Sequence, residues 1–307
     1  MANIVSKLVC RSTSQRMTAK HKPIGGPVPS EILKTLLCQI DDALIALAKS
    51  TPMTDENIHQ TRKTLKRARA NLRLLRSTVD KRLYARENAR LRDAARLLAP
   101  IRDVQAALNT IATLPTRESS VARGALLRRL KARLLKSHAA LHGAFQDGNV
   151  AQQATQMLND SRIYTARWRT PDDDAAALHT DLKRIYRRGR NALANVTTSC
   201  TDENLHELRK QVKYLWHALD ALHQAGAKHL SRAARSAESI ADCLGDDHDL
   251  ALIRETISAV DRNPRTTDAE LHAHLEQRRG KLQSDALKLS RRLYAQRPGA
   301  WSCLTKL

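Results

Sequence analysis

The sequence has few of the residues on which many folds and binding chemistries depend. Of its 307 residues only nine are aromatic (one Phe, five Tyr and three Trp), and there are ten glycines and nine prolines. Strands are enriched in aromatic and β-branched residues, and dinucleotide-binding enzymes need glycine-rich turns. This composition therefore disfavours a β-sandwich, a Rossmann-type enzyme and any module that stacks nucleobases on aromatic platforms.

Cysteine pairs and long apolar runs are also missing. The five cysteines are scattered and never spaced as Cys-x-x-Cys, which gives no support for a disulfide framework or a cysteine-rich zinc site. No stretch approaches the roughly 18 apolar residues of a membrane-spanning helix, and the N-terminus has no secretory hydrophobic region. We therefore expect a protein of the reducing cytoplasm without a transmembrane segment.

What the sequence has in excess is helix-forming residues and positive charge. Ala, Leu, Arg and Lys dominate, and all four are strong helix formers. Lys and Arg number 53 against 31 Asp and Glu, a net charge of +22, of which residues 29–150 carry +12 and residues 151–307 carry +5. Such an excess repels itself unless an anion neutralises it. We expect an all-α protein with a polyanionic partner, for which nucleic acid, an acidic membrane surface and inorganic polyphosphate all qualify.

Short breaks rich in Pro, Gly, Asn and Thr divide the chain into about eight predicted helices. Their approximate bounds are 30–50, 54–80, 82–113, 117–146, 173–196, 201–225, 228–260 and 267–296. We predict two tandem four-helix bundles, separated by a linker and flanked by a basic, flexible N-terminal arm and a C-terminal tail. The corresponding ranges are 1–29 for the arm, 30–147 and 173–297 for the bundles, 148–172 for the linker and 298–307 for the tail.

An internal repeat supports the division into two halves. The segment 56–66, ENIHQTRKTLK, aligns with 203–213, ENLHELRKQVK, at a constant offset of 147 residues. A second pair, IRDV at 101–104 and DHDL at 247–250, follows at nearly the same offset. Two tandem units of one design explain both matches.

On a helix, the repeated segments place a row of basic side chains beside an apolar seam, and Thr54 and Thr201 stand where N-caps belong. The row of the first copy consists of His59, Arg62, Lys63, Lys66, Arg69 and Arg73. The row of the second copy consists of His206, Arg209, Lys210, Lys213 and His217. Further basic candidates on the fourth predicted helix are Arg129, Arg133 and Lys136.

The simplest alternative is that these cations decorate a solvated helix face. Such a face normally mixes signs, because acid–base pairs at i,i+4 contribute about 0.2–0.5 kcal/mol each. The face from His59 to Arg76 is nearly free of acids, and a similar row recurs at matched positions. At ~1.5 Å per residue, the row from His59 to Arg73 spans about 21 Å. That length favours binding of a chain of phosphates over binding of one small anion.

The second repeated motif allows two interpretations. His248-Asp249 resembles part of a metal-dependent phosphohydrolase site, but such sites need further His and Asp ligands. The matching residue in the first half is Arg102, which cannot bind a metal. We favour the interpretation that Asp103 and Asp249 position neighbouring basic side chains or cap a helix turn, while Arg102 and His248 take part in anion binding. No metal and no cofactor is expected.

At these residues the sequence resembles the CHAD (conserved histidine α-helical) domain family. The family pattern places His-x-x-Arg-[Lys/Arg]-x-x-[Lys/Arg] on one helix and an [Arg/His]-Asp pair on the next, in each of two halves. The resemblance covers about residues 30–297. The matching residues are His59, Arg62, Lys63, Lys66, Arg102 and Asp103 in the first half and His206, Arg209, Lys210, Lys213, His248 and Asp249 in the second.

The resemblance implies two four-helix bundles related by a pseudo-twofold axis, with basic residues lining a central cavity or pore. Family members are similar in binding inorganic polyphosphate and in associating with polyphosphate granules. We therefore expect a stand-alone, non-enzymatic polyphosphate-binding protein. A nucleic-acid-binding protein and a phosphohydrolase acting through His248 and Asp249 are the alternatives, and the oligomeric state is left open.

The second half departs from the first in one respect. Trp216 and Asp220 stand where the first half has Arg69 and Arg73. We therefore expect the second half to contribute a shorter basic row and the first half to bind the polyanion more strongly.

Overall fold

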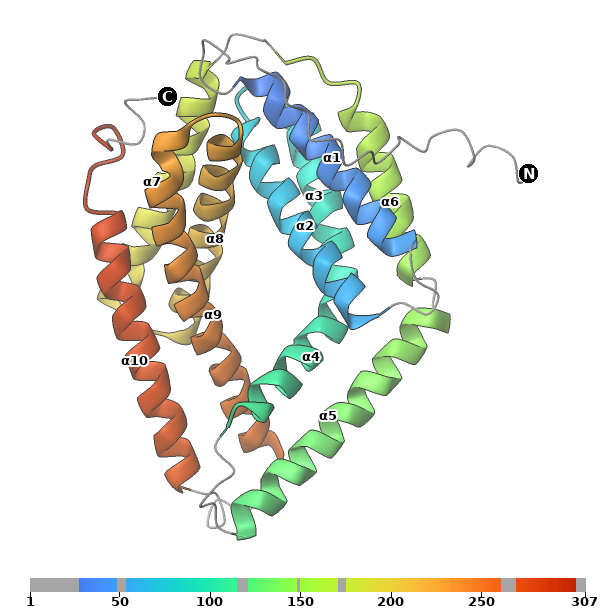
Figure 1. Ribbon diagram of the computed structural model, residues 1–307, viewed down its shortest axis with the longest axis vertical. Helices are drawn as coiled ribbons and strands as arrows, with labels where there is room; N and C mark the ends of the chain where they lie inside the picture. The colour runs from blue at the N-terminus through green and yellow to red at the C-terminus, as the bar shows by residue number, and fades with distance from the viewer. Residues whose placement is uncertain are drawn as a thin grey trace.

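The part of the chain that the structure describes contains helices joined by turns and no strand, which confirms the predicted all-α class. The computed structural model describes residues 28–48, 54–114, 121–147, 150–170, 175–260 and 269–301. Within these ranges it has ten α-helices, one short 3₁₀ helix (Lys228–Leu230) and no strand (Figure 1). The α-helices are α1 (Pro29–Ala48), α2 (Asp55–Leu74), α3 (Lys81–Leu97), α4 (Ala99–Ala112), α5 (Val121–Asp147), α6 (Val150–Thr165), α7 (Ala175–Thr198), α8 (Asp202–Gln224), α9 (Ser231–Val260) and α10 (Ala269–Leu293).

Two groups of four helices form the body of the molecule. Helices α1, α2, α3 and α6 pack together, and α7, α8, α9 and α10 form the second group. Helices α2 and α8, which carry the repeated motif, pack against each other and join the two groups through one large apolar core (Figure 1). The basic rows of the two repeats are therefore brought to the centre of the molecule. The pseudo-twofold relation between the groups stays a prediction.

Helices α4 and α5 extend from the first group toward the second. In Figure 1 they run below α2 and α3 to the far ends of α9 and α10. A second, smaller apolar cluster holds them there, in which Leu130 of α5 and Ile253 of α9 are fully buried. The two groups are thus joined twice, once through α2 and α8 and once through α4, α5 and α9.

Two segments differ from the predicted helix pattern. The helix expected over 82–113 is divided at Leu98, because Pro100 stands in the first turn of α4 and lacks the N–H that a continuous helix needs. The segment 148–172, predicted to be a linker, contains helix α6. Its buried residues Ala154, Leu158, Ser161 and Thr165 recur at helical spacing and face α1 and α3.

The expected N-caps of the two motif-bearing helices are confirmed. The hydroxyl of Thr54 accepts a hydrogen bond from the N–H of Asn57 at 3.2 Å, and the hydroxyl of Thr201 accepts one from the N–H of Asn204 at 3.2 Å. Both helices therefore begin at matched positions of the repeat. Within the described ranges no helix is long and apolar enough to cross a bilayer. The predicted arm at 1–29 lies almost wholly outside the described residues, as does most of the predicted tail at 298–307.

Candidate anion-binding cleft

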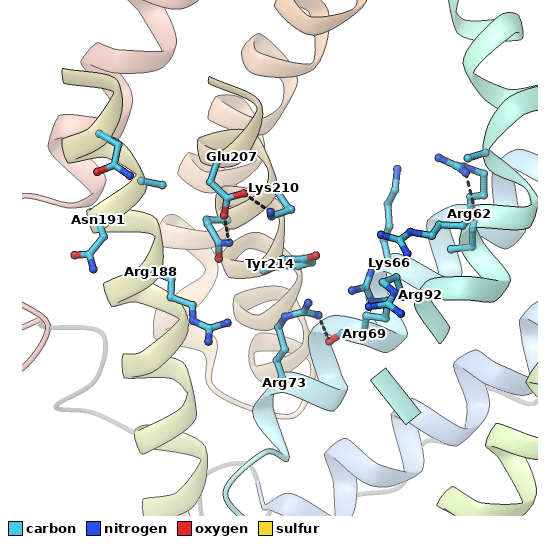
Figure 2. Close-up of a pocket in the computed structure, with 16 residues that line it drawn as sticks. Arg62, Lys66, Arg69, Arg73, Arg92, Arg188, Asn191, Glu207, Lys210 and Tyr214 are labelled. Carbon is cyan, nitrogen blue, oxygen red and sulfur yellow. Dashed lines mark hydrogen bonds and ion pairs between the residues drawn. The ribbon is translucent and has the colours of Figure 1, made fainter. Parts of the chain in front are cut away.

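A cleft of about 750 Å³ lies between the two groups of helices (Figure 2). Of its 16 lining residues eight are Lys or Arg and one, Glu207, is acidic, so its walls are strongly cationic. We call it the basic cleft. Its cationic residues are Arg62, Lys66, Arg69 and Arg73 from α2, Arg92 and Arg96 from α3, Arg188 from α7 and Lys210 from α8.

Helix α2 supplies one whole wall of the basic cleft. Its four cationic residues are spaced by four, three and four positions, so they lie along one face beside the buried seam that includes Leu65 and Leu72. From Arg62 to Arg73 this row extends about 16 Å at ~1.5 Å per residue. Four of the six residues of the row predicted from the sequence are therefore brought together on a single surface, whereas His59 and Lys63 do not line the cleft.

Contacts within the protein fix the guanidinium groups at both ends of this row. Arg62 donates from Nη1 to the carbonyl of Ala95 at 2.8 Å, and Arg73 donates from Nη1 to the carbonyl of Arg69 at 2.7 Å. The guanidinium of Arg73 also lies over the ring of Tyr214, 3.6 Å from its centroid. A guanidinium has five N–H donors, so both groups keep donors for a ligand while their positions are held.

The α8 wall is less cationic. Its one basic residue, Lys210, is ion-paired with Glu207, which also accepts a hydrogen bond from Gln211 at 2.6 Å. Although burial alone raises the pKa of Glu207, the bonds from Lys210 and Gln211 lower it below its usual value. The carboxylate therefore stays ionised and offsets the charge of Lys210 on this wall.

Basic residues of the two repeats lie close enough to repel one another. Burial and the neighbouring Arg62 and Arg209 lower the pKa of Lys66 to about 8. Burial, Arg209 and Lys66 lower the pKa of Lys213 to about 7. Arg102 of α4 contributes to the same field. We call Lys66, Arg102, Arg209 and Lys213 the inner cluster, and an anion bound there would relieve this repulsion.

The two predicted positioning acids face the inner cluster. Asp103 lies 3.7 Å from Nη2 of Arg62. Burial raises the pKa of Asp249, and the nearby Arg209 and Arg102 act in the opposite direction. Burial likewise lowers the pKa of Arg209, while Asp249 and Asp103 act to raise it. Each acid therefore has an arginine as its main electrostatic partner.

Three of the predicted histidines lie at the edge of the same region. Nδ1 of His59 accepts a hydrogen bond from Nε of Arg102 at 3.0 Å, and the rings of His206 and His248 are 4.9 Å apart. Burial, followed by arginines close by, lowers the pKa of all three, that of His248 to about 4. At neutral pH these imidazoles are therefore uncharged and act as hydrogen-bonding groups.

The remaining predicted residues do not line the cleft. His217 is buried and stacks on Trp216 with ring centroids 4.4 Å apart, and burial together with Arg67 lowers its pKa to about 3. Lys63 is half-buried on α2 and lies outside the cleft lining. Three candidates on α5 are exposed and do not line the cleft either, namely Arg129, Arg133 and Lys136.

Several lining residues were not singled out by the sequence analysis. Arg92 and Arg96 are one turn apart on α3, a spacing that is visible in the sequence, and Arg188 belongs to a basic run on α7. Which basic residues of these runs face the cleft depends on how α3 and α7 pack against the motif-bearing helices. Asn191 and Tyr214 carry no charge, so no charge pattern in the sequence indicates that they line the cleft.

A second hollow of about 300 Å³ lies between α4, α9 and α10. Its charged lining is mixed, since Arg102 and Arg278 are accompanied by Asp246 and Asp249. The basic cleft is therefore the better location for a highly charged anion.

Three arginines in or beside the inner cluster have N–H donors without a partner within the described part of the protein. Nε of Arg62, Nη1 of Arg102 and Nε of Arg209 are buried and have no hydrogen-bond acceptor among the described residues. Buried donors in proteins are almost always paired. These three donors are therefore available to an acceptor that is not part of the described chain.

Fold and site together define an all-helical protein whose two motif-bearing helices meet at a cation-lined cleft. The family model of the CHAD domain matches residues 34–258. The chain therefore belongs to the CHAD domain family, as the sequence motifs indicated.

Solved structures show the same fold. PptA from Streptomyces chartreusis is similar with a TM-score of 0.59 and 17% identity, over 88% of this chain and 100% of that one. The CHAD domain from the plant Ricinus communis is similar with a TM-score of 0.54 and 16% identity, over 89% of this chain and 93% of that one. No curated protein matches the sequence.

Proposed function

We propose that the protein binds inorganic polyphosphate in the basic cleft and does not act on it as an enzyme. The observation that carries this proposal is the lining of the cleft, in which eight Lys and Arg residues from α2, α3, α7 and α8 accompany one carboxylate. Arginine forks suit the paired oxygens of a phosphate, and lysines act as point charges. Membership of the CHAD family supports the same ligand.

The cleft favours a chain of phosphates over a nucleic acid. Single strands are commonly held by stacking of bases on aromatic side chains, at about 1–3 kcal/mol per base. Tyr214 is the one aromatic residue of the lining, and the guanidinium of Arg73 lies 3.6 Å from the centroid of its ring. A base would have to displace Arg73 to stack there, whereas a phosphate would bind to it.

The positions of Asp103 and Asp249 support a binding role over hydrolysis. A metal-dependent hydrolase needs carboxylates that are available to the metal. Asp103 is ion-paired with Arg62, and Asp249 faces Arg209. Each carboxylate is therefore already engaged with an arginine.

We extend the proposal to polyphosphate granules in the cytoplasm. A polymer longer than the row on α2 would leave the cleft at its ends, so one protein could hold a segment of a chain that belongs to a larger particle. Co-sedimentation of the purified protein with polyphosphate–Mg²⁺ particles, compared with the cleft variant described below, tests this part separately.

The central experiment is titration of the full-length protein with polyphosphate of defined length at several salt concentrations. By analogy with single-stranded nucleic acids, log K should fall with log salt at a slope of about −0.7 per phosphate neutralised. Charge reversal of Arg62, Lys66, Arg209 and Lys213 to Glu should abolish binding while the helix content, followed by circular dichroism, is retained. Binding that survives in this variant would contradict the proposed site.

A matched control is available on α5. Reversal of Arg129, Lys131, Arg133 and Lys136 to Glu makes the same change in net charge on exposed residues outside the cleft. We expect this variant to keep most of the affinity. An equal loss in both variants would show that net charge, and not the cleft, determines binding.

Two further assays separate the alternatives. Competition between polyphosphate and single-stranded DNA at equal phosphate concentration should favour polyphosphate, and a preference for DNA would make the nucleic-acid alternative correct. Incubation of polyphosphate with the protein and Mg²⁺ or Mn²⁺ should leave its chain length unchanged on a gel. Shortening that is lost in His248→Ala would establish the hydrolase alternative.

A further inference from the structure

A group of metal-ligating side chains lies outside the basic cleft, where α5 meets the start of α2. Nε2 of His138 is 2.9 Å and Nε2 of His142 is 2.8 Å from the same oxygen, Oδ1 of Asp55. The two rings are 4.6 Å apart. In the described part of the chain these three residues form the one group of three or more His, Cys, Asp or Glu side chains whose ligand atoms converge.

We propose that Asp55, His138 and His142 form a binding site for a divalent transition-metal ion, with zinc as the best fit, that links α5 to α2. Two imidazole nitrogens and one carboxylate oxygen are a common zinc ligand set that leaves a fourth position for water. Imidazole ligands also disfavour Mg²⁺ and Ca²⁺, which prefer oxygen. The proposal is independent of polyphosphate binding.

The sequence and the helix geometry prearrange two of the three ligands. His138 and His142 are four residues apart on α5, so both rings project from the same face one turn apart. Asp55 occupies the first turn of α2, whose position is fixed by the Thr54 cap. The three ligands therefore come from two rigid helices and not from loops.

The spacing and accessibility of the ligand atoms fit an ion. Zinc bonds of about 2.0–2.2 Å in a tetrahedron place ligand atoms about 3.3 Å apart. The observed separations of 2.8 and 2.9 Å need to open by about half an ångström. The side chains of His138 and His142 are 19% and 20% exposed and that of Asp55 is 37% exposed, so an ion and a water ligand can reach them.

A bound ion would add a cross-link that the packing of the helices lacks. Helix α5 packs mainly against α4 and also contacts α6 and α9, whereas the pairing of its histidines with Asp55 connects it to α2. His59 lies one turn further along α2, so the link anchors the beginning of the helix that carries the basic row. None of the three ligands lines the basic cleft.

The test uses the full-length protein, stripped with a chelator and kept free of polyphosphate. Cobalt(II) is titrated while its visible d–d absorption is followed, and zinc is then added to displace it. We expect one equivalent bound with a spectrum typical of nitrogen and oxygen ligands in four or five coordination. In His138→Asn/His142→Asn the affinity should fall by at least about 100-fold, more than the 10–100-fold cost of losing an outer-sphere partner.

A matched control removes two histidines elsewhere. His179→Asn/His274→Asn changes partly exposed residues on α7 and α10 that belong to no converging group of ligands in the described ranges. This variant should bind cobalt as the unmodified protein does. Zinc should raise the Tm of the unmodified and control proteins but not that of His138→Asn/His142→Asn.

Either of two results would overturn the proposal: equal cobalt affinity in His138→Asn/His142→Asn and in the control, or zinc affinity of the unmodified protein no higher than its Mg²⁺ affinity. Should the double variant lose helix content, Asp55→Asn takes its place, because it keeps the shape of the side chain and removes the ligand charge. Retention of the cobalt spectrum and affinity in Asp55→Asn would then reject the site.

Discussion

Helices α2 and α8 carry the same motif, yet they make different contributions to the basic cleft. Helix α2 supplies four cations, whereas α8 supplies Lys210 together with Glu207, Gln211 and Tyr214. The residues of α8 that match the α2 row are Arg209, Lys213, Trp216 and Asp220, and none of them lines the cleft. A repeated motif therefore does not produce a repeated surface.

The difference follows from the way the two helices pack. Because α2 and α8 lie against each other, one side of the pair exposes different faces of the two motifs. The α8 motif directs Arg209 and Lys213 to the inner cluster. Further along, Trp216 stacks on His217, and Asp220 accepts a hydrogen bond from Gln224 at 3.0 Å. Helix α8 thus has the shared motif but not the two further arginines, Arg69 and Arg73, that lengthen the row on α2.

Among the tests that compare α2 with α8, we expect the largest change in polyphosphate affinity when the matched cations of each helix are neutralised in turn. Arg62→Gln/Lys66→Gln removes two cations from the α2 wall, and Arg209→Gln/Lys213→Gln removes their counterparts. The α2 variant should lose on the order of 100-fold in polyphosphate affinity, since two charge-assisted hydrogen bonds contribute about 1.5 kcal/mol or more each.

The α8 variant should lose less, on the order of tenfold. Lys213 is only partly protonated at neutral pH, and the charge of Arg209 is offset by Asp249. Titration calorimetry at one salt concentration measures both losses, with circular dichroism as the control for folding. Equal losses would show that the two helices contribute alike and would contradict the asymmetry.

The dependence of binding on pH distinguishes the two matched lysines. In the free protein the pKa values of Lys66 and Lys213 are about 8 and about 7. A bound anion raises both values, so binding takes up protons, and affinity is highest below pH 7 and falls as pH rises through this range. The slope of log K against pH is limited to one unit per lysine.

Replacement of Lys213 by arginine shows which part of the pH dependence of binding is due to each lysine. In Lys213→Arg the side chain stays charged throughout, so the fall in affinity should begin near the pKa of Lys66. Lys63→Arg, a change outside the cleft lining, should leave the profile unchanged. Fluorescence anisotropy with labelled polyphosphate between pH 6 and 9 measures all three proteins, and an unaltered profile in Lys213→Arg would contradict the role given to this lysine.

The difference between α2 and α8 also shows which features of the structure the sequence could predict. Helical periodicity was sufficient to place Arg62, Lys66, Arg69 and Arg73 on one face, because that relation is local to one helix. The inward direction of His217 depends on which neighbours pack against α8, a non-local property of the fold.

The residues that the sequence analysis missed have the same physical explanation. Arg92, Arg96 and Arg188 reach the cleft only through the packing of α3 and α7. Helix-breaking residues, Gly148 and Pro171, flank helix α6 in the sequence, and its apolar pattern is short. The sequence therefore predicts a linker where the structure has a helix. The converging ligands Asp55, His138 and His142 are more than 80 residues apart in sequence at their widest, so only the fold brings them together.

The position that matches Arg73 offers a third and smaller test of the comparison. Asp220→Arg gives α8 the residue that α2 has at Arg73, but position 220 does not line the cleft, so the affinity for polyphosphate should rise by no more than in a control with the same change in net charge. Asp160→Arg on α6 is that control, because Asp160 also accepts a hydrogen bond from a glutamine one turn away, at 3.0 Å. A clearly larger gain in Asp220→Arg than in Asp160→Arg would contradict the asymmetry.

A last, small effect concerns the acid on the α8 wall. Glu207→Gln removes the partner of Lys210 and frees that cation for phosphate. Partly exposed ion pairs contribute about 0.2–1 kcal/mol, so the affinity should rise about two- to fivefold. Glu203→Gln makes the same charge change in the exposed first turn of α8, outside the cleft lining, and should have no measurable effect. If Glu207→Gln alone improves binding, the weakness of the α8 wall is due to its own carboxylate and not only to its shorter basic row.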